Sequence, residues 1–543
     1  MPPAEDTIAT SELSVSALSS LPEYVDLSTD LAFPAIGDQG DMNSCAGWAT
    51  TYYQFTYEVN KLKGTAARDD SGNNIVENVY SPSWTYNYIN GGKNVGVYID
   101  DAYDILKNQG SMTLADFPYN GTKSGYSFAW SSNIEKMIEA LEYRAIYHTS
   151  YASTSDEIAH IKERLASGHL FVVWTNKNGW TVERNSAGQY VVVRGSDHDS
   201  SSGGHFMTIV GYDDDIEITV NNTTLKGAFK LANSWGTAAE NHNNGYIWVA
   251  YDALNSTSNS GVSGNGNRTR IFAPGGEYPN YFYYIDVYEC EVSFAGYVEY
   301  NSIEPHDIML YASAGSSVDV SQYSSDLRWD CELNASDTLG DSSAASRFIV
   351  FDYFSIGAEY DLNDYLSNYW TVKINDSSVS TNNGMRVKVT DNFGNVIAPS
   401  DNYKYMVSNG SVTRSVKANL AKGRVTSYDN SAFTTEDTAL IMEFITRKVE
   451  FSNLQIFLAD YNGDGAVSLT DVTAMNRIIS ARNGETYSIT DEVEGWGCSL
   501  ADVIEEEFNI PIEQYVAENY EELSAMNVIP LEMESNYIKE RIL

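Results

Sequence analysis

Residues 37–49 read GDQGDMNSCAGWA, and this stretch determines how the first half of the chain is interpreted. A glycine-rich segment leads into Cys45, and residues 46–63 have the pattern of a buried helix. A cysteine that opens a helix meets unpaired backbone N–H groups and the positive end of the helix dipole, and both favour its thiolate form. Cys45 is therefore a candidate nucleophile as well as a candidate small core residue. Gln39 precedes it by six residues, so its side-chain amide and the Cys45 N–H can together hold an oxyanion.

A cysteine nucleophile needs a base, and His205 is the best placed of the seven histidines. It follows Gly203-Gly204 and begins an apolar strand that is predicted to run to Tyr212. Asn233 stands at the end of the next predicted strand, where its side chain can orient an imidazole. Trp235, two residues later, can shield that contact from water.

These segments resemble the papain family of cysteine peptidases, which shows Gln-Gly-x-x-x-Ser-Cys, then His before an apolar strand, then Asn-Ser-Trp-Gly. The resemblance covers about residues 22–275 and implies an α+β papain-like fold. It also implies a mechanism in which Cys45 attacks a peptide carbonyl, His205 protonates the leaving amine and Asn233 orients His205. Gln39 would stabilise the oxyanion. No catalytic cofactor is implied.

The resemblance extends to the substrate cleft, for which the family pattern implies Gly91, Gly92, Gly204 and Trp235. Two departures stand out. Met42 replaces a cysteine that many members use in a disulfide. The Cys45 to His205 gap of 160 residues and the Cys45 to Asn233 gap of 188 exceed the usual spacing, so surface insertions are expected around 197–202 and 214–226.

Each motif alone also fits a structural explanation, namely a core cysteine, a surface histidine and a turn asparagine. Four motifs in the family's order favour a peptidase. A catalytically silent papain-like adaptor that binds a peptide or an inhibitor is the alternative.

A second motif lies in the C-terminal part of the chain and has the spacing of a calcium-binding loop. Oxygen-bearing side chains fall at loop positions 1, 3, 5, 9 and 12, the carbonyl at position 7 adds a ligand, and Gly465 occupies the turn at position 6. The predicted ligands are Asp460, Asn462, Asp464, Ala466, Ser468 and Asp471. An acidic surface turn is the alternative explanation.

Aspartate at position 12, a helix at 472–480 and the lack of a clear helix before the loop resemble the dockerin module. This small α-helical, EF-hand-like module attaches enzymes to cohesin domains of scaffold proteins in cellulosomes, the bacterial complexes that degrade cellulose. The resemblance implies a cohesin partner and a secreted, extracellular protein at the bacterial cell surface. A second loop keeps Asp491 and Asp502 but has Val493 and Gly495 at ligand positions, so one intact calcium site is expected.

The middle of the chain, residues 277–451, shows short strands separated by turns and predicts an all-β sandwich. Its aromatic residues, such as those at 281–284 and 369–370, fit either sugar stacking or a core. A carbohydrate-binding accessory protein is therefore a third hypothesis. With a lead-in at 1–21, a peptidase domain at 22–276 and a dockerin with an acidic extension at 452–543, the chain is predicted to be multidomain.

Charge and hydropathy exclude other classes of partner. The 543 residues include 33 basic and 74 acidic side chains, a net charge of −41, which disfavours nucleic acid and anionic membranes. No apolar run is long enough for a transmembrane helix, so no membrane insertion is expected. The first residues lack the pattern of a signal peptide, so secretion is inferred from the dockerin resemblance alone.

Overall fold

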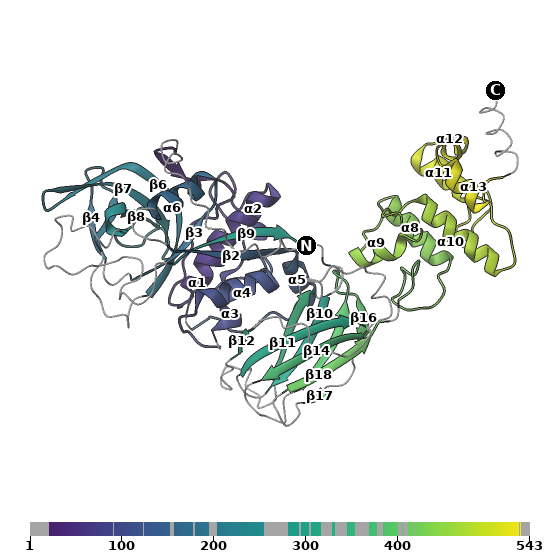
Figure 1. The fold of residues 1–543 in the computed structure, drawn as a ribbon, viewed down its shortest axis with the longest axis horizontal. Helices are drawn as coiled ribbons and strands as arrows, with labels where there is room; N and C mark the ends of the chain where they lie inside the picture. The colour runs from purple at the N-terminus through teal and green to yellow at the C-terminus, as the bar shows by residue number, and fades with distance from the viewer. Residues whose placement is uncertain are drawn as a thin grey trace.

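The computed structural model describes residues 21–90, 92–122, 124–151, 157–176, 180–194, 204–254, 281–290, 292, 295–302, 306–315, 328–331, 345–352, 369–376, 384–399, 404–405, 411–418, 420–530 and 533. The predicted lead-in, apart from its last residue, Gly91 and the predicted insertion at 197–202 lie outside these residues. Within them, no helix combines the length and apolar character that a membrane span requires. Figure 1 shows a mixed helix–sheet region, a region of two β-sheets and a helical region, in chain order.

The first region begins with a long buried helix, as the sequence predicts. Three segments follow one another without a break from Cys45 to Lys63: α1 (Cys45–Gly47), the wider-turned η3 (Trp48–Phe55) and α2 (Thr56–Lys63). The side chains are buried from Ala46 to Asn60, so this helix lies inside the domain. Gly64 ends it in the left-handed conformation that favours glycine.

The other helices of this region are shorter. They are η2 (Leu27–Thr29), η4 (Val76–Asn78), α3 (Pro82–Ile89), α4 (Ile99–Gln109), α5 (Ile134–Glu139), η5 (Ala140–Glu142), α6 (Glu157–Ala166) and α7 (Tyr251–Leu254). Of these, α3 and α4 pack on the core helix, whereas α6 and α7 pack on strands.

A nine-stranded sheet forms the other half of this region, in the order β2-β9-β3-β6-β7-β8-β5-β4, with β1 paired to β6. The strands are β1 (Tyr24–Asp26), β2 (Tyr143–Tyr151), β3 (Phe171–Asn176), β4 (Thr181–Arg184), β5 (Tyr190–Arg194), β6 (Gly204–Val220), β7 (Thr223–Ala232), β8 (Tyr246–Ala250) and β9 (Tyr281–Glu289). The strand predicted from His205 to Tyr212 and the next predicted strand, before Asn233, correspond to β6 and β7. Strands β6 and β7 extend past the predicted ends as one long hairpin, so the segment around 214–226 is its outer part.

Strand β9 corrects the predicted boundary between the first two domains. The predicted boundary at 276/277 puts this strand in the middle domain, but it pairs antiparallel with β2 over its whole length and also with β3. Phe282 and Tyr283 are buried, and the Tyr283 carbonyl accepts a hydrogen bond from Gln54 Nε2 of the core helix at 3.2 Å. These aromatic side chains fill the core of the first region, and do not form a platform for sugars.

Two antiparallel sheets follow, in agreement with the predicted β-rich middle. One has the order β13-β10-β15-β16 with β17 paired to β15, and the other β12-β11-β14-β18. The strands are β10 (Ala295–Ser302), β11 (His306–Gly315), β12 (Arg328–Cys331), β13 (Ala345–Asp352), β14 (Tyr369–Asp376), β15 (Gly384–Thr390), β16 (Val396–Pro399), β17 (Lys404–Tyr405) and β18 (Ser411–Lys417). Buried Val350, Val387 and Val416 bring both sheets into one core.

The helical region starts earlier than predicted. It contains α8 (Thr435–Ile445), α9 (Asn453–Ala459), α10 (Leu469–Arg482), α11 (Leu500–Phe508), α12 (Ile512–Glu518) and α13 (Tyr520–Met526). Helix α8, in the predicted middle domain, packs on α10. Helix α9 directly precedes the Asp460 loop, so the expectation of no helix there was wrong. A capping box opens each of four helices here, in the pairs Thr434/Asp437, Ser452/Gln455, Ser468/Asp471 and Ser499/Asp502.

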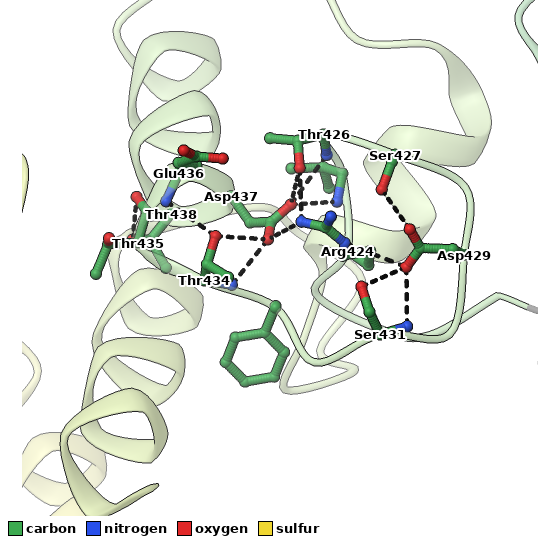
Figure 2. A network of polar contacts seen from close by, with 12 residues as sticks. Arg424, Thr426, Ser427, Asp429, Ser431, Thr434, Thr435, Glu436, Asp437 and Thr438 are labelled. Carbon is green, nitrogen blue, oxygen red and sulfur yellow. Dashed lines mark hydrogen bonds and ion pairs between the residues drawn. The ribbon is translucent and has the colours of Figure 1, made fainter. Parts of the chain in front are cut away.

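The loop before α8 is organised around the buried carboxylate of Asp437 (Figure 2). Its Oδ1 accepts from the backbone N–H of Val425 and Thr426, and its Oδ2 accepts from the Thr434 N–H. Arg424 Nη1 donates to Oδ2 at 2.7 Å. Burial by itself raises the pKa of Asp437, but these hydrogen bonds and the guanidinium outweigh it, so the pKa is lowered. The chain thus supplies its own cation to this loop.

We expect Arg424→Leu to cost about 3 kcal/mol of stability in the helical region, because it leaves Asp437 charged and buried without its cation. Hydrogen exchange of α8 and α10 amides in the full chain measures this loss. Lys448→Met is the control, since the Lys448–Glu507 pair is largely exposed and its loss should cost less than about 1 kcal/mol. Equal protection in the two variants would contradict the assignment.

The same contribution depends on pH with a defined sign. Because the folded-state pKa of Asp437 is lowered, its stabilisation is complete above the ordinary carboxyl pKa of about 4. It is lost as the pH falls through the lowered folded-state value. The Arg424→Leu variant should show a smaller acid-dependent loss of protection in α8.

Candidate active site

A short antiparallel contact joins the first and the last of the peptidase motifs, the one before Cys45 and the one that contains Asn233. The Gln39 N–H donates to the Ser234 carbonyl at 2.8 Å, and the Gly236 N–H donates to the Gly37 carbonyl at 2.9 Å. Asp38 and Trp235 face each other in this bridge. The segment before Cys45 and the segment after β7 therefore hold each other in place.

Tyr53 of the core helix stabilises the contact between the segments around Gly37 and Asn233. Its buried hydroxyl donates to the Asn233 carbonyl at 2.8 Å and accepts from the Gly37 N–H at 3.1 Å. Burial raises the pKa of Tyr53 well above its ordinary value, so the hydroxyl stays protonated and can donate. One side chain thus satisfies a backbone group from each of the two segments.

Cys45 is the first residue of α1 and is half-buried. Helix α1 packs against β6, the strand that carries His205, and Thr208 Oγ1 of β6 donates to the Ala49 carbonyl at 3.2 Å. The thiol is therefore at a helix N-terminus, as the sequence predicts, and its helix packs on the strand that begins with the predicted base.

The Gln39 side chain is held by both of its polar atoms. Its Oε1 accepts from Ser234 Oγ at 2.6 Å, and its Nε2 donates to the Met42 carbonyl at 2.7 Å. This orientation keeps the amide nitrogen on the side of the 42–45 turn, since the oxygen is committed to Ser234. Tyr119 supports the turn, because its hydroxyl donates to the Gln39 carbonyl at 2.8 Å and lies 2.7 Å from Ser44 Oγ.

His205 and Asn233 form the predicted pair. His205 Nε2 lies 2.8 Å from Asn233 Oδ1, and both residues are buried. The Trp235 ring stacks on the His205 ring, with centroids 4.6 Å apart and an angle of 25° between the planes. This stacking excludes water from the hydrogen bond on one side. Asn233 Oδ1 also accepts from the Ser234 N–H at 2.8 Å.

Of the residues predicted to bind substrate, the structure describes Gly92, Gly204 and Trp235. The loop that contains Gly92 is tied to the segment before Cys45, because Asn94 Oδ1 accepts from the Asn43 N–H at 2.7 Å. Gly204 starts β6, and a Cβ there would lie 2.8 Å from Trp174 Nε1. Gly91 lies outside the described residues.

Sequence reasoning missed several residues of the site. Ser234 stands inside the Asn-Ser-Trp-Gly motif, so that motif pointed to its neighbourhood without giving it a role. Tyr53 and His242 carry no motif, and each acts on Asn233 through a contact that only the fold creates.

The Asp460 loop follows α9 directly. The Asp460 carboxylate accepts from the backbone N–H groups of Gly463, Asp464 and Gly465, which wraps the loop around position 1. Gly463 and Gly465 both have a positive φ, which favours glycine. The oxygens of Asp460, Asn462 and Asp464 belong to this tight turn, as a hard cation requires.

The carboxylate oxygens of Asp471, at position 12, are already engaged by the backbone. Its oxygens accept from the backbone N–H groups of Tyr461, Asn462 and Ser468. Among the described residues, no three or more His, Cys, Asp or Glu side chains are grouped so that they could hold a metal ion as they stand. Calcium ligation by Asp471 therefore requires an exchange of N–H bonds for the ion. In the second loop, Val493 is buried at the third position and supplies no side-chain oxygen.

The class of the protein follows from the segment that carries this fold. Residues 21–263 match the family described as papain family cysteine protease. This segment is a papain family cysteine protease domain, and the protein is a papain-like peptidase, a hydrolase.

Solved structures that match part of the chain include cysteine proteases. Xylellain, from Xylella fastidiosa, shares 20% identity and a TM-score of 0.35, over 50% of this chain and 89% of its own. A Carica candamarcensis cysteine protease in complex with E-64 shares 15% identity and a TM-score of 0.29, over 49% of this chain and 98% of its own. No curated protein matches the chain.

We expect Tyr53→Phe to lower kcat about tenfold, because the Gly37 N–H and the Asn233 carbonyl lose their shared partner. Tyr52→Phe is a matched control. The Tyr52 hydroxyl also bridges two groups, the Ala35 carbonyl and Asn74 Nδ2, but lies outside the Asn233 contact. Both variants should lose about 1–2 kcal/mol of stability. A similar fall in kcat for Tyr52→Phe would show that stability alone explains the effect.

Proposed function

We propose that this peptidase hydrolyses peptide bonds with Cys45 as nucleophile, His205 as acid and base, and Asn233 as the orienting residue. The observation that carries the proposal is the buried 2.8 Å contact between His205 Nε2 and Asn233 Oδ1, beside the helix that Cys45 opens. Because Nε2 is engaged by Asn233, the proton that is transferred is carried on Nδ1 of His205.

In the acylation step, the Cys45 thiolate attacks the peptide carbonyl carbon and forms a C–S bond. The C–N bond breaks as His205 gives its Nδ1 proton to the leaving amine. In the second step a water molecule attacks the thioester, with His205 taking its proton. The acid product leaves and the thiolate is regenerated.

The carbonyl oxygen gains negative charge in both steps, and two donors are available to it. They are the Cys45 backbone N–H and the Gln39 amide nitrogen, which Ser234 and Met42 hold in orientation. These donors are set before the substrate arrives, so the stabilisation requires no rearrangement.

Peptides and proteins are the proposed substrates. The loop that contains Gly92, the start of β6 at Gly204 and the face of Trp235 are the proposed walls of the cleft. The tie between Asn94 and Asn43 supports this placement, because it holds the Gly92 loop against the turn before Cys45.

The test is turnover of a pooled fluorogenic peptide library under reducing conditions. We expect wild-type activity, a loss of at least about 10³-fold in Cys45→Ala, and a similar loss in His205→Ala. Cys498→Ala is the control and should keep full activity, since Cys498 lies in the helical region. Activity that survives in Cys45→Ala would refute the proposal, and an inactive wild-type protein would favour the silent adaptor.

We also propose that the Asp460 loop binds calcium and that the helical region is a dockerin-like module that attaches the enzyme to a cohesin domain outside the cell. The donor chemistry supports calcium, because six oxygen ligands follow the spacing of a calcium loop from Asp460 to Asp471. The loop before α8 can be compared with the Asp460 loop. Before α8, the positive charge beside the Asp437 carboxylate comes from Arg424. In the Asp460 loop, a calcium ion would bring positive charge to the carboxylates of Asp460, Asp464 and Asp471.

We expect calcium added to the chelator-treated full chain to bind with measurable heat and to raise the melting temperature of the helical region. Asp464→Asn should weaken calcium binding at least about tenfold, because it removes one ligand charge. Asp491→Asn, in the second loop, is the control and should bind as the wild type does. The absence of calcium heat in the wild type would refute the metal site. Cohesin capture that is insensitive to chelator would refute its role in attachment.

A further inference from the structure

We propose that His242 is a positioning residue for catalysis, which holds the Asn233 side-chain amide with its oxygen toward His205. The inference rests on the proposed roles of His205 and Asn233. It adds a fourth residue, from the loop between β7 and β8, to the Cys45–His205–Asn233 arrangement.

The contacts of His242 form a continuous chain. Asn233 Nδ2 lies 2.7 Å from His242 Nε2, and His242 Nδ1 lies 2.7 Å from the Glu240 carbonyl. A carbonyl only accepts, so Nδ1 carries the hydrogen. Nε2 is then the acceptor, and the amide nitrogen of Asn233 donates to it. Both ring nitrogens are satisfied in one neutral tautomer.

This tautomer determines which way the Asn233 amide faces. The two ends of an asparagine side chain are almost equal in size, so packing alone barely distinguishes them. The Ser234 N–H requires the amide oxygen at one end, and the Nε2 lone pair of His242 requires the amide nitrogen at the other. With both requirements met, Oδ1 faces His205 Nε2. A reversed amide would place N–H groups against the N–H of His205.

Trp235 contacts both imidazole rings. It stacks on His205 at 4.6 Å, and it meets His242 edge to face, with centroids 5.4 Å apart. Burial lowers the pKa of His242, which favours the neutral ring that this arrangement needs. His242 therefore acts on His205 through Asn233, without touching the reacting atoms.

Three substitutions separate the functions of the His242 ring. In His242→Gln, the side-chain oxygen can occupy the place of Nε2, so the acceptor for Asn233 is kept. In His242→Asn, the side chain can reach the Glu240 carbonyl but not Asn233. In His242→Phe, the ring contact with Trp235 is kept while both hydrogen bonds are lost.

The experiment is steady-state kinetics of these variants on one fluorogenic peptide from the library, with melting temperatures measured alongside. We expect kcat to fall about tenfold in His242→Asn and His242→Phe with KM changed less than about twofold. His242→Gln should stay within about threefold of the wild type. Equal losses in all three variants would reduce His242 to a structural role, and wild-type kcat in His242→Phe would overturn the proposal.

The outcome is distinguishable from failure of the proposed function. Wild type and Cys45→Ala are assayed on the same peptide. Activity that depends on Cys45 but not on the acceptor at residue 242 would overturn only the role of His242. Activity that does not depend on Cys45 would overturn the proposed function and this inference with it.

Discussion

The antiparallel contact between residues 37–39 and 234–236 is the constraint on which the rest of the peptidase site depends. Two backbone hydrogen bonds, 2.8 and 2.9 Å long, join segments that are almost 200 residues apart in the chain. Gln39 and Ser234 are paired directly through their side chains at 2.6 Å. The donor proposed for the oxyanion and the residue that orients the base are therefore parts of one rigid unit.

The surroundings of this contact explain why it keeps a single geometry. The tyrosine hydroxyls around it are costly to remove, because an unpaired donor or acceptor in the interior costs about 1–3 kcal/mol. Tyr53 serves both segments from the core helix, and Tyr119 supports the turn before Cys45. The helix that contributes Tyr53 also begins with Cys45, so the nucleophile and the contact are fixed by the same element.

The candidate site residues were predictable from the sequence because their signal lies in residue type and order. Cys45, His205, Asn233 and Gln39 came from motifs, and the structure places them in one region. The domain to which β9 belongs was not predictable in this way. Its partner β2 lies more than 100 residues earlier, and its aromatic pattern suits either the core of this sheet or the start of a new domain. Helix α9 escaped prediction because it has only seven residues. The contacts of Tyr53 and His242 with Asn233 were not predicted, because neither residue belongs to a sequence motif and only the fold brings it to Asn233.

The most direct test of this account is the rate at which iodoacetamide alkylates Cys45 as a function of pH, followed by mass spectrometry. Cys498 in the same chain is the internal reference, since burial raises the pKa of its thiol. The account predicts that Cys45 reacts rapidly at about pH 6, well below the pKa of about 8.5 of a free thiol, because the helix N-terminus and His205 stabilise the thiolate. A rate for Cys45 that rises only near pH 8.5 would contradict it.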